Sequence, residues 1–358
     1  MSNYYLLLFS FLGGILAFLN PVRLHAIDRA TTSLYTLLYG PDNTSTTIRT
    51  LRKATTAGDE WAMERLRSCY PIGDGVQQDY AEAVRWFRPA AEQGYAPAQW
   101  ALGLCYHLGQ GVAQDDNKAI YWCRRSADQG YVEAEFALGV SYDLGWGVPK
   151  DRKESIRWYR LAAEHGYAAA QFAMALVYED MGDLAQYKEE AARWYRLAAE
   201  QGYIAAQFNL AICYEEGNGV PKDYIEAARW YRLAAEQGDA EAQYQIGLCY
   251  RKGIGVNQSD TEAVRWYLSS ASQGYAEAQV ALGRCYVEGI GVIRSYEKAA
   301  SWFLSAAERG DASAQFNLGY LYHKGLGVAT NQEKAIYWLT KARNGGNQKA
   351  RDLLRRIR

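Results

Sequence analysis

The sequence predicts an all-α fold, an αα-hairpin superhelical solenoid of eight 36-residue repeats with terminal half-repeat caps. Three observations predict it: a glycine recurs every 36 residues, each repeat keeps the same three residues, and each repeat holds two stretches with helical periodicity. The recurring glycines are Gly58, Gly94, Gly130, Gly166, Gly202, Gly238, Gly274, Gly310 and Gly346. Because stacked repeats pack on their neighbours, this regularity favours binding and scaffolding without naming a ligand.

The repeat at 203–238 shows its two helices most clearly. In the first, Ala206, Leu210 and Tyr214 fall on one face of a helix with 3.6 residues per turn. In the second, Trp230 lies on an equivalent apolar face, and the closing Gly238 ends the helix at its C′ position. A short loop with the pattern Gly-x-Gly-Val joins the two, so each repeat is an αα-hairpin.

A polar residue stands where the second helix of most repeats begins. Its side chain is expected to accept hydrogen bonds from the unpaired N–H groups of the first helical turn. These predicted N-caps are Asp79, Asp115, Asp151, Asp223, Ser259, Ser295 and Asn331. A glutamate three residues later predicts a reciprocal capping box in four repeats, at Glu82, Glu154, Glu226 and Glu262.

Three positions hold the same residue in all eight repeats, and we expect all three in the core. The first is tryptophan, at 86, 122, 158, 194, 230, 266, 302 and 338. The second is tyrosine, at 70, 106, 142, 178, 214, 250, 286 and 322. The third is alanine, at 62, 98, 134, 170, 206, 242, 278 and 314. Small alanines let helices approach closely, and the aromatic rings fill the space between hairpins.

The N-terminus carries an apolar run at 4–19. Its 16 residues are short for a membrane span, which needs about 20, and fit the apolar region of a secretory signal. Leu24-His25-Ala26 is an acceptable cleavage site, so 1–26 is predicted to be a signal peptide. No Lys or Arg precedes the run, which leaves an uncleaved N-terminal anchor as the alternative.

The rest of the chain divides into four predicted parts. Residues 27–45 are a polar linker, and 46–58 resemble the second half of a repeat and are predicted to cap the array. Residues 59–346 hold the eight repeats, and 347–358 are predicted to form a basic C-terminal cap helix. A small patch that contacts anions is the alternative interpretation of that basic end.

One repeat, 167–202, departs from the pattern. Its loop reads Met181-Gly182-Asp183-Leu184 in place of Gly-x-Gly-Val, and Tyr187 replaces the polar cap. Drift in a tolerant loop explains this, and the alternatives are a local change of curvature or a recognition feature.

Charge and cysteine content exclude some classes of function. The chain has 39 basic and 40 acidic residues, so no net basic surface for nucleic acid is expected. Five cysteines share one repeat position, at 69, 105, 213, 249 and 285. Equivalent positions in packed helices lie ~8–10 Å apart, beyond the ~7 Å Cα separation a disulfide allows. Only Cys123, on a second helix, could reach Cys105.

These repeats resemble the Sel-one-like repeat, a relative of the tetratricopeptide repeat with a longer loop. The markers, as they stand in one repeat, are Leu102-Gly103, Tyr106, Gly109-x-Gly111-Val112, Trp122 and Gly130. The resemblance covers 59–346 and implies a right-handed αα-solenoid used for protein interaction. It also implies, for bacterial members with signal peptides, a part in host-cell contact or signalling. Some cysteine-rich relatives are described as penicillin-binding or β-lactamase-like, but they carry two cysteines per repeat, which this chain lacks.

Residues suited to catalysis are few. Ser295-Tyr296-Glu297-Lys298 matches the Ser-x-x-Lys of serine β-lactamases, but Ser295 occupies the cap position and no Lys-Thr-Gly partner is present. The four histidines have no metal-ligand spacing. We therefore expect no enzyme activity, no cofactor and no metal.

A candidate binding groove lies on the first helices, on the side that lines the concave surface in tetratricopeptide-like geometry. Its aromatic row is Trp100, Phe136, Phe172, Phe208, Tyr244 and Phe316, followed by Leu104, Val140, Leu176, Ile212 and Leu248. A variable row lies just beyond, at His107, Asp143, Glu179, Glu215, Arg251 and His323. The two alternatives are an exposed groove for a peptide or helix, and an aromatic row buried between neighbouring first helices.

The sequence thus favours a monomeric, exported scaffold, periplasmic, secreted or envelope-associated, that binds a protein or peptide. It predicts no nucleic-acid partner and no membrane span beyond the possible N-terminal anchor. The alternatives are a penicillin-binding or β-lactamase-like secreted protein and, if 4–19 is not a signal, a cytoplasmic adaptor.

Overall fold

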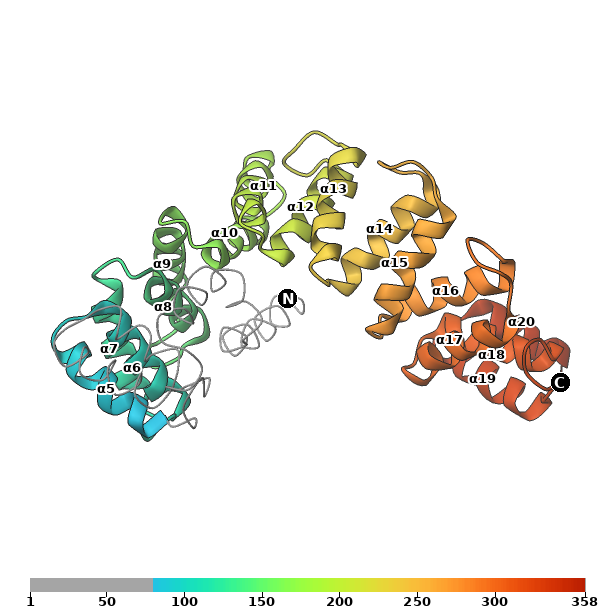
Figure 1. The fold of residues 1–358 in the computed structure, drawn as a ribbon, viewed down its shortest axis with the longest axis horizontal. Helices are drawn as coiled ribbons and strands as arrows, with labels where there is room; N and C mark the ends of the chain where they lie inside the picture. Colours follow the sequence, from blue (N-terminus) through green and yellow to red (C-terminus); the bar gives the residue numbers. More distant parts are fainter. Residues whose placement is uncertain (1–79, 358) are drawn as a thin grey trace, which may run out of the picture. The chain divides into compact units, whose positions relative to one another are not determined.

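The computed structural model describes residues 80–357, and within them every regular element is an α-helix (Figure 1). The helices are α5 Tyr80–Glu92, α6 Ala96–Leu108, α7 Asp116–Ala127, α8 Val132–Leu144, α9 Arg152–Glu164, α10 Ala168–Asp180, α11 Ala185–Glu200, α12 Ile204–Glu216, α13 Tyr224–Glu236, α14 Ala240–Lys252, α15 Asp260–Ser272, α16 Ala276–Glu288, α17 Tyr296–Glu308, α18 Ala312–Lys324, α19 Gln332–Asn344 and α20 Gln348–Ile357. The all-α prediction is therefore confirmed.

Helices alternate between two roles. The even-numbered helices α6 to α20 are called first helices here, and the odd-numbered α5 to α19 second helices. From α5 to α9 in the first unit and from α11 to α20 in the second, each helix packs on the next, so that a first helix packs on the second helix of its own repeat and that second helix packs on the first helix of the next repeat. Two compact units can be distinguished, 1–170 and 171–358, and each is described by itself.

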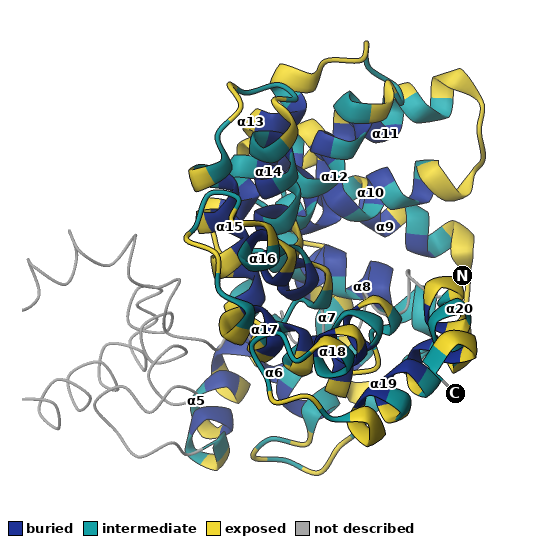
Figure 2. Cartoon of the chain, turned by 90° about the vertical axis from the view of Figure 1, so that its right-hand side faces the viewer, coloured by how far each residue is buried: buried dark blue, intermediate teal, exposed yellow. Residues whose placement is uncertain are grey.

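The core runs between helices rather than through a single centre. In α12 the buried residues include Ala206, Leu210 and Cys213, and in α13 they include Trp230 and Ala234. Figure 2 shows the pattern, with buried residues concentrated where helices face one another and exposed residues on loops and outer sides. The small residues allow the close approach that the aromatic rings then fill.

The predicted N-caps of the second helices are present wherever the structure describes them. Asp223 accepts hydrogen bonds from the backbone N–H groups of Ile225 (2.9 Å) and Glu226 (3.1 Å). The same contact is made by Asp115, Asp151, Ser259, Ser295 and Asn331. The predicted cap Asp79 lies outside the described residues.

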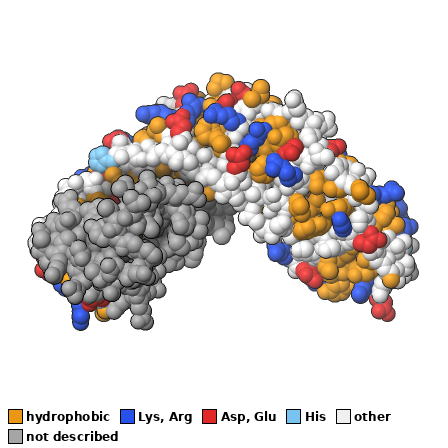
Figure 3. All heavy atoms as spheres, in the orientation of Figure 1, with side chains coloured by type: hydrophobic (Ala, Val, Ile, Leu, Met, Phe, Trp, Pro, Cys, Tyr) orange, Lys and Arg blue, Asp and Glu red, His pale blue; other side chains and the backbone are white. Residues whose placement is uncertain are grey.

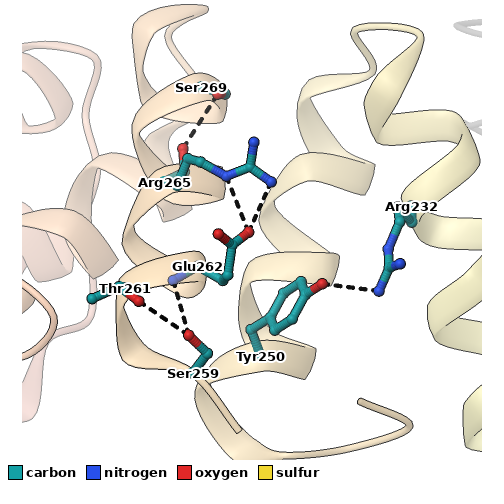
Figure 4. Close-up of polar contacts among 7 residues, drawn as sticks. All are labelled: Arg232, Tyr250, Ser259, Thr261, Glu262, Arg265 and Ser269. Carbon is teal, nitrogen blue, oxygen red and sulfur yellow. Dashed lines mark hydrogen bonds and ion pairs between the residues drawn. The ribbon is translucent and has the colours of Figure 1, made fainter. Parts of the chain in front are cut away.

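The predicted capping boxes take a different form. The cap's own N–H does not bond to the glutamate; for Ser259 it donates to the backbone oxygen of Tyr250 (2.9 Å), which closes the loop. The glutamate binds an arginine one turn later instead, as Glu262 does with Arg265 at 2.8 Å (Figure 4). In an isolated helix, the glutamate side chain would accept the hydrogen bond from the N–H of the cap residue. In this fold, the closed loop supplies a backbone oxygen for that N–H instead.

In the Gly-x-Gly loops, contact between repeats requires glycine at the second position. Both glycines of the loop 253–255 have positive φ, at 68° and 69°. A Cβ on Gly253 would meet only the Gln258 side chain, at 3.3 Å. A Cβ on Gly255 would collide with the backbone oxygen of Tyr224, in the first turn of the preceding second helix. The second glycine is therefore required by packing as well as by conformation.

Buried glutamines link successive repeats. The amide nitrogen of Gln207 donates to the backbone oxygen of Ala199 (3.1 Å), and its oxygen accepts from the amide of Gln237 (2.7 Å). The same side-chain pair is formed by Gln99 with Gln129, Gln171 with Gln201, and Gln243 with Gln273. In one repeat of the first unit, the pair is Glu135 with His165, at 2.9 Å.

The repeat with the unusual loop has a longer second helix. Helix α11 begins at Ala185 and has 16 residues, whereas most second helices have 13. Its N-cap residue Leu184 makes no side-chain cap hydrogen bond and is exposed. Without the Gly-x-Gly turn, the helix starts one turn earlier, so the 36-residue phase is kept.

At the C-terminal end, α20 adds one more first helix. Ala350 and Leu354 are buried against α19, and the Asn347 side chain accepts a hydrogen bond from the backbone N–H of Ala350 at 3.0 Å. The predicted signal peptide (1–26), linker (27–45) and N-terminal cap (46–58) lie outside the described residues. No helix among the described residues is long and apolar enough to cross a membrane.

Candidate protein-binding surface

The predicted aromatic row lies largely inside the stack of helices. Phe136 and Phe172 are only 6% exposed, while Trp100, Phe208, Tyr244 and Phe316 are half-buried. The structure therefore places these rings between helices, in keeping with the second of the two alternatives. Their part in binding a partner stays a prediction, and only the half-buried rings present an accessible edge.

Each ring of this row is packed by tyrosines. Phe172 lies 5.7 Å from the ring of Tyr195, in the second helix of its own repeat, and 5.1 Å from Tyr203, which precedes the next first helix. Tyr244 has the same two neighbours in Tyr267 (5.8 Å) and Tyr275 (5.5 Å). Such tilted ring pairs favour one fixed stacking of neighbouring repeats.

The variable row is engaged within its own repeats. His107 Nδ1 lies 2.9 Å from Asp116 Oδ1, and Arg251 donates to Asp260 at 3.1 Å. In both cases the partner is the first residue of the following second helix. These side chains fasten the two helices of one hairpin, so a partner protein would have to compete with that contact.

Glu215 makes a different contact from the same position. Its carboxylate accepts a hydrogen bond of 2.7 Å from the buried hydroxyl of Tyr231. Burial, followed by this hydrogen bond, raises the pKa of Tyr231, so the phenol remains a donor at any physiological pH. Two other residues of the variable row lie in the last turn of a first helix: Glu179 is exposed and Asp143 is half-buried.

A more exposed surface lies on the first helices α14, α16 and α18, and we call it the outer face. It comprises Glu241, Leu248, Lys252, Glu277, Arg284, Glu288, Tyr320 and Lys324. Leu248, Arg284 and Tyr320 occupy one repeat position and differ in chemical type, and Tyr320 is 39% exposed. On the side of the molecule drawn in Figure 3, apolar side chains are interspersed with both signs of charge.

Sequence reasoning found one row of the outer face and missed the others. It included Leu248, which continues an aliphatic row, but it did not extend that row to Arg284 and Tyr320, where the residue type changes. Helical spacing places Glu277 and Arg284 on the same side of α16, seven residues apart. The signal was present, since a position that varies in chemistry within a fixed repeat is typical of a surface.

The Ser-x-x-Lys match has a structural role. The Ser295 hydroxyl oxygen accepts from the backbone N–H of Lys298 (3.2 Å) and donates to the Glu297 carboxylate (2.9 Å). The Lys298 ammonium lies over the Tyr286 ring, 5.4 Å from its centre. Ser295 therefore serves as the N-cap of α17, and its lysine is directed to another partner. Among the described residues, no cluster of His, Cys, Asp and Glu could hold a metal ion.

The described cysteines are free thiols. Cys105, Cys213, Cys249 and Cys285 are buried in first helices, and Cys123 is half-buried on α7. Burial raises the pKa of Cys105, Cys123 and Cys213 to about 12. Such thiols behave as small apolar residues rather than as nucleophiles.

Comparison with known proteins identifies the repeat. The family model described as Sel1 repeat matches eight times, at 68–95, 96–131, 132–167, 168–203, 204–239, 240–275, 276–311 and 312–347. The matches keep the 36-residue phase predicted from the glycines. No curated protein matches the chain.

Two solved structures are similar over most of the chain. A Sel1 repeat protein from Oxalobacter formigenes is 35% identical, with a TM-score of 0.61, over 87% of this chain and 90% of its own. The Escherichia coli protein c5321, described as a protective antigen of uropathogenic strains with an SLR fold, is 31% identical. Its TM-score is also 0.61, over 86% of this chain and 73% of its own. Repeat phase, helix pairing and these similarities together show that the chain belongs to the Sel1 repeat family.

Proposed function

We propose that this protein is an exported, non-enzymatic scaffold that binds another protein through the outer face of its first helices. The supporting observation is the division of each repeat into a constant interior and a varied exterior. The alanine position packs between helices in every described repeat, whereas the position that holds half-buried Leu248 in α14 holds exposed Arg284 in α16 and exposed Tyr320 in α18. A scaffold needs constant packing and a surface that is free to vary.

Export rests on the apolar run at 4–19 and on the likeness to c5321. That E. coli protein is described as a protective antigen, which fits a molecule that the immune system of a host can reach. By analogy, the present chain acts at the cell envelope or outside it, in contact with a host or in signalling. Fractionation with N-terminal sequencing tests this: we expect a mature chain beginning after Ala26, and recovery of the intact chain in the cytoplasm would favour the adaptor alternative.

Affinity capture tests the binding surface. The full chain, purified from its native compartment, is the bait, and the test variant reverses two exposed charges on α16, Glu277→Lys with Arg284→Glu. The control variant makes the same exchange on the second helix α9, with Arg160→Glu and Glu164→Lys, whose side chains are also exposed. Both variants keep the net charge of the chain.

We expect the captured partner to bind at least ~10-fold more weakly to the α16 variant and normally to the α9 variant. Circular dichroism of both variants confirms that helix content is unchanged. Equal capture by the two variants would contradict binding through the exposed charges of α16 and so overturn the outer-face proposal.

A further inference from the structure

A cleft opens between α18 and α20, near the C-terminal end of the second unit. Its volume is about 470 Å³, and its lining includes Tyr320, His323, Lys324, Leu353, Arg356 and Ile357. The volume falls within the range of cavities that take small ligands or a few side chains. The cleft lies beside the outer face, with which it shares Tyr320 and Lys324.

The polar side of this cleft is cationic and contains no carboxylate. At the equivalent place in two other repeats, His107 faces Asp116 and Arg251 faces Asp260. Here His323 faces the neutral amide of Gln332, with 3.1 Å between Nδ1 and Oε1. The acidic partner that neutralises the other two sites is therefore missing from this one.

The two cations that line the cleft remain uncompensated. Neither Lys324 nor Arg356 forms an ion pair with any residue in 80–357, and both side chains are exposed. The surrounding segment 312–357 is strongly basic although the whole chain has a net charge of −1. Its only acidic residues are Glu333 and Asp352, against Lys324, Lys334, Lys341, Arg343, Lys349, Arg351, Arg355 and Arg356.

The other side of the cleft is apolar. Leu353 and Ile357 lie one helical turn apart on α20 and are partly buried against the terminal core, and the Tyr320 ring lies on α18. An apolar wall beside unpaired cations suits a ligand that carries an aliphatic side chain next to carboxylates. Arg356 can bind a carboxylate through two parallel hydrogen bonds, which gives geometric preference as well as charge attraction.

We propose that this cleft binds an acidic segment of a partner protein, with an aliphatic side chain against Leu353 and Ile357 and flanking carboxylates on Lys324 and Arg356. This inference rests on the proposed scaffold function and names the chemistry of one segment of its partner. Charge complementarity specifies the ligand class, since the basic end of a nearly neutral chain attracts acidic sequences.

The test is a fluorescence-anisotropy titration of the full chain with the labelled peptide Glu-Glu-Leu-Glu-Glu at about 50 mM salt. We expect saturable binding to the native protein. The variant Lys324→Gln with Arg356→Gln should bind at least ~10-fold more weakly, because it removes two charged hydrogen-bonding groups. The matched control is Lys349→Gln with Arg351→Gln, which also removes two charges, both on α20 outside the cleft, and should change affinity less than ~2-fold.

Two altered peptides test the apolar and acidic contacts separately. Replacing Leu by Gly should weaken binding if the wall of Leu353 and Ile357 is used, and replacing the four Glu by Gln should abolish it. The proposal is overturned if either altered peptide binds with the affinity of the original peptide. It is also overturned if the native protein and the double variant bind the original peptide with equal affinity. So does tighter binding of a single-stranded oligonucleotide or an anionic lipid vesicle to the same residues, because the cleft would then bind polyanions in general.

The outcome can be separated from that of the proposed function. If the α16 variant loses the captured partner while the native protein does not bind the peptide, only the acidic-segment proposal fails. If the peptide binds as expected but capture does not depend on the α16 charges, only the outer-face proposal fails.

Discussion

At the scale of single residues, the Glu135–His165 pair stands apart from the neutral glutamine pairs. Glu135 is fully buried, with 0% exposure, and one of its carboxylate oxygens, Oε1, has no hydrogen-bond partner. His165 supplies the contact to the other oxygen and is itself partly exposed. Loss of the hydrogen-bond partner destabilises a protein more when a buried carboxylate is left behind than when a buried neutral amide is.

A double-mutant cycle tests this dependence. We expect His165→Ala to lower the free energy of unfolding by ~1–3 kcal/mol, because it leaves a buried carboxylate without a donor. In the Glu135→Gln background the same change should cost less than ~1 kcal/mol. Urea denaturation measures both; equal costs in the two backgrounds would show that the pair is not coupled.

The buried tryptophans offer a second test at this scale. Trp194 is 7% exposed in α11, and Trp194→Ala should cost ~3–5 kcal/mol of unfolding free energy through lost contacts and a cavity. Tyr337→Ala, which truncates an exposed aromatic residue on α19, serves as the control and should cost less than ~0.5 kcal/mol. A denaturation midpoint unchanged by Trp194→Ala would be incompatible with a core role.

Thiol chemistry gives a third test. Because the pKa of Cys105, Cys123 and Cys213 is about 12, only roughly 1 in 10,000 of each of these thiols is ionised to thiolate at pH 8. Alkylation of the native protein, read by peptide mass spectrometry, should therefore leave these three unmodified, whereas denaturant should make all three react. Rapid native labelling of Cys105 would contradict the burial described here.

At the scale of elements, the loop of each hairpin has two structural roles. It reverses the chain through two residues of positive φ, and it seats its second glycine on the preceding second helix. The sequence predicts the turn, because Gly-x-Gly is a local signal. It cannot tell which glycine also touches a neighbouring repeat, because that contact joins residues about 30 positions apart.

Two single substitutions in one loop distinguish the role in chain reversal from the role in packing between repeats. Gly253→Ala and Gly255→Ala both place a Cβ at a φ near 68°, which costs ~1–2 kcal/mol in either case. Gly255→Ala should cost at least ~1 kcal/mol more, since its Cβ collides with the backbone of Tyr224. Urea unfolding of the two variants measures the difference; the reverse order would mean that the loop does not pack as described.

At the scale of the whole molecule, stability is a sum over repeats and the contacts between neighbours. Deletion of one in-phase repeat, 204–239, joins two equivalent positions and should leave helix content per residue unchanged. Deletion of the half-repeat 204–221 removes α12 and leaves the second helices α11 and α13 in succession without the first helix between them, and it should lower helix content. Circular dichroism and thermal melting compare the two; similar losses in both would argue against repeat-by-repeat stacking.

The sequence by itself determined the repeat, its two helices and the caps, because these depend on residues within one 36-residue unit. It also indicated a core of tryptophan and alanine, because a residue kept in every copy is constrained by packing. Its prediction of a core tyrosine was wrong for most described repeats, since Tyr106 is buried but the tyrosines at 142, 178, 214, 250, 286 and 322 are only half-buried. Its capping-box prediction was wrong in detail, since the N–H of Ser259 is satisfied by Tyr250 and Glu262 is left to bind Arg265.

Only the tertiary structure decided which side chains are left for a partner. Phe136 and Phe172 look like groove residues in sequence, yet the rings of Tyr159 and Tyr195, from the following second helices, pack against them. The cleft at Lys324 and Arg356 is formed by two helices that meet across a repeat boundary. The physical reason is that helical periodicity fixes which residues share a face, while burial of that face depends on neighbouring repeats that a local pattern does not specify.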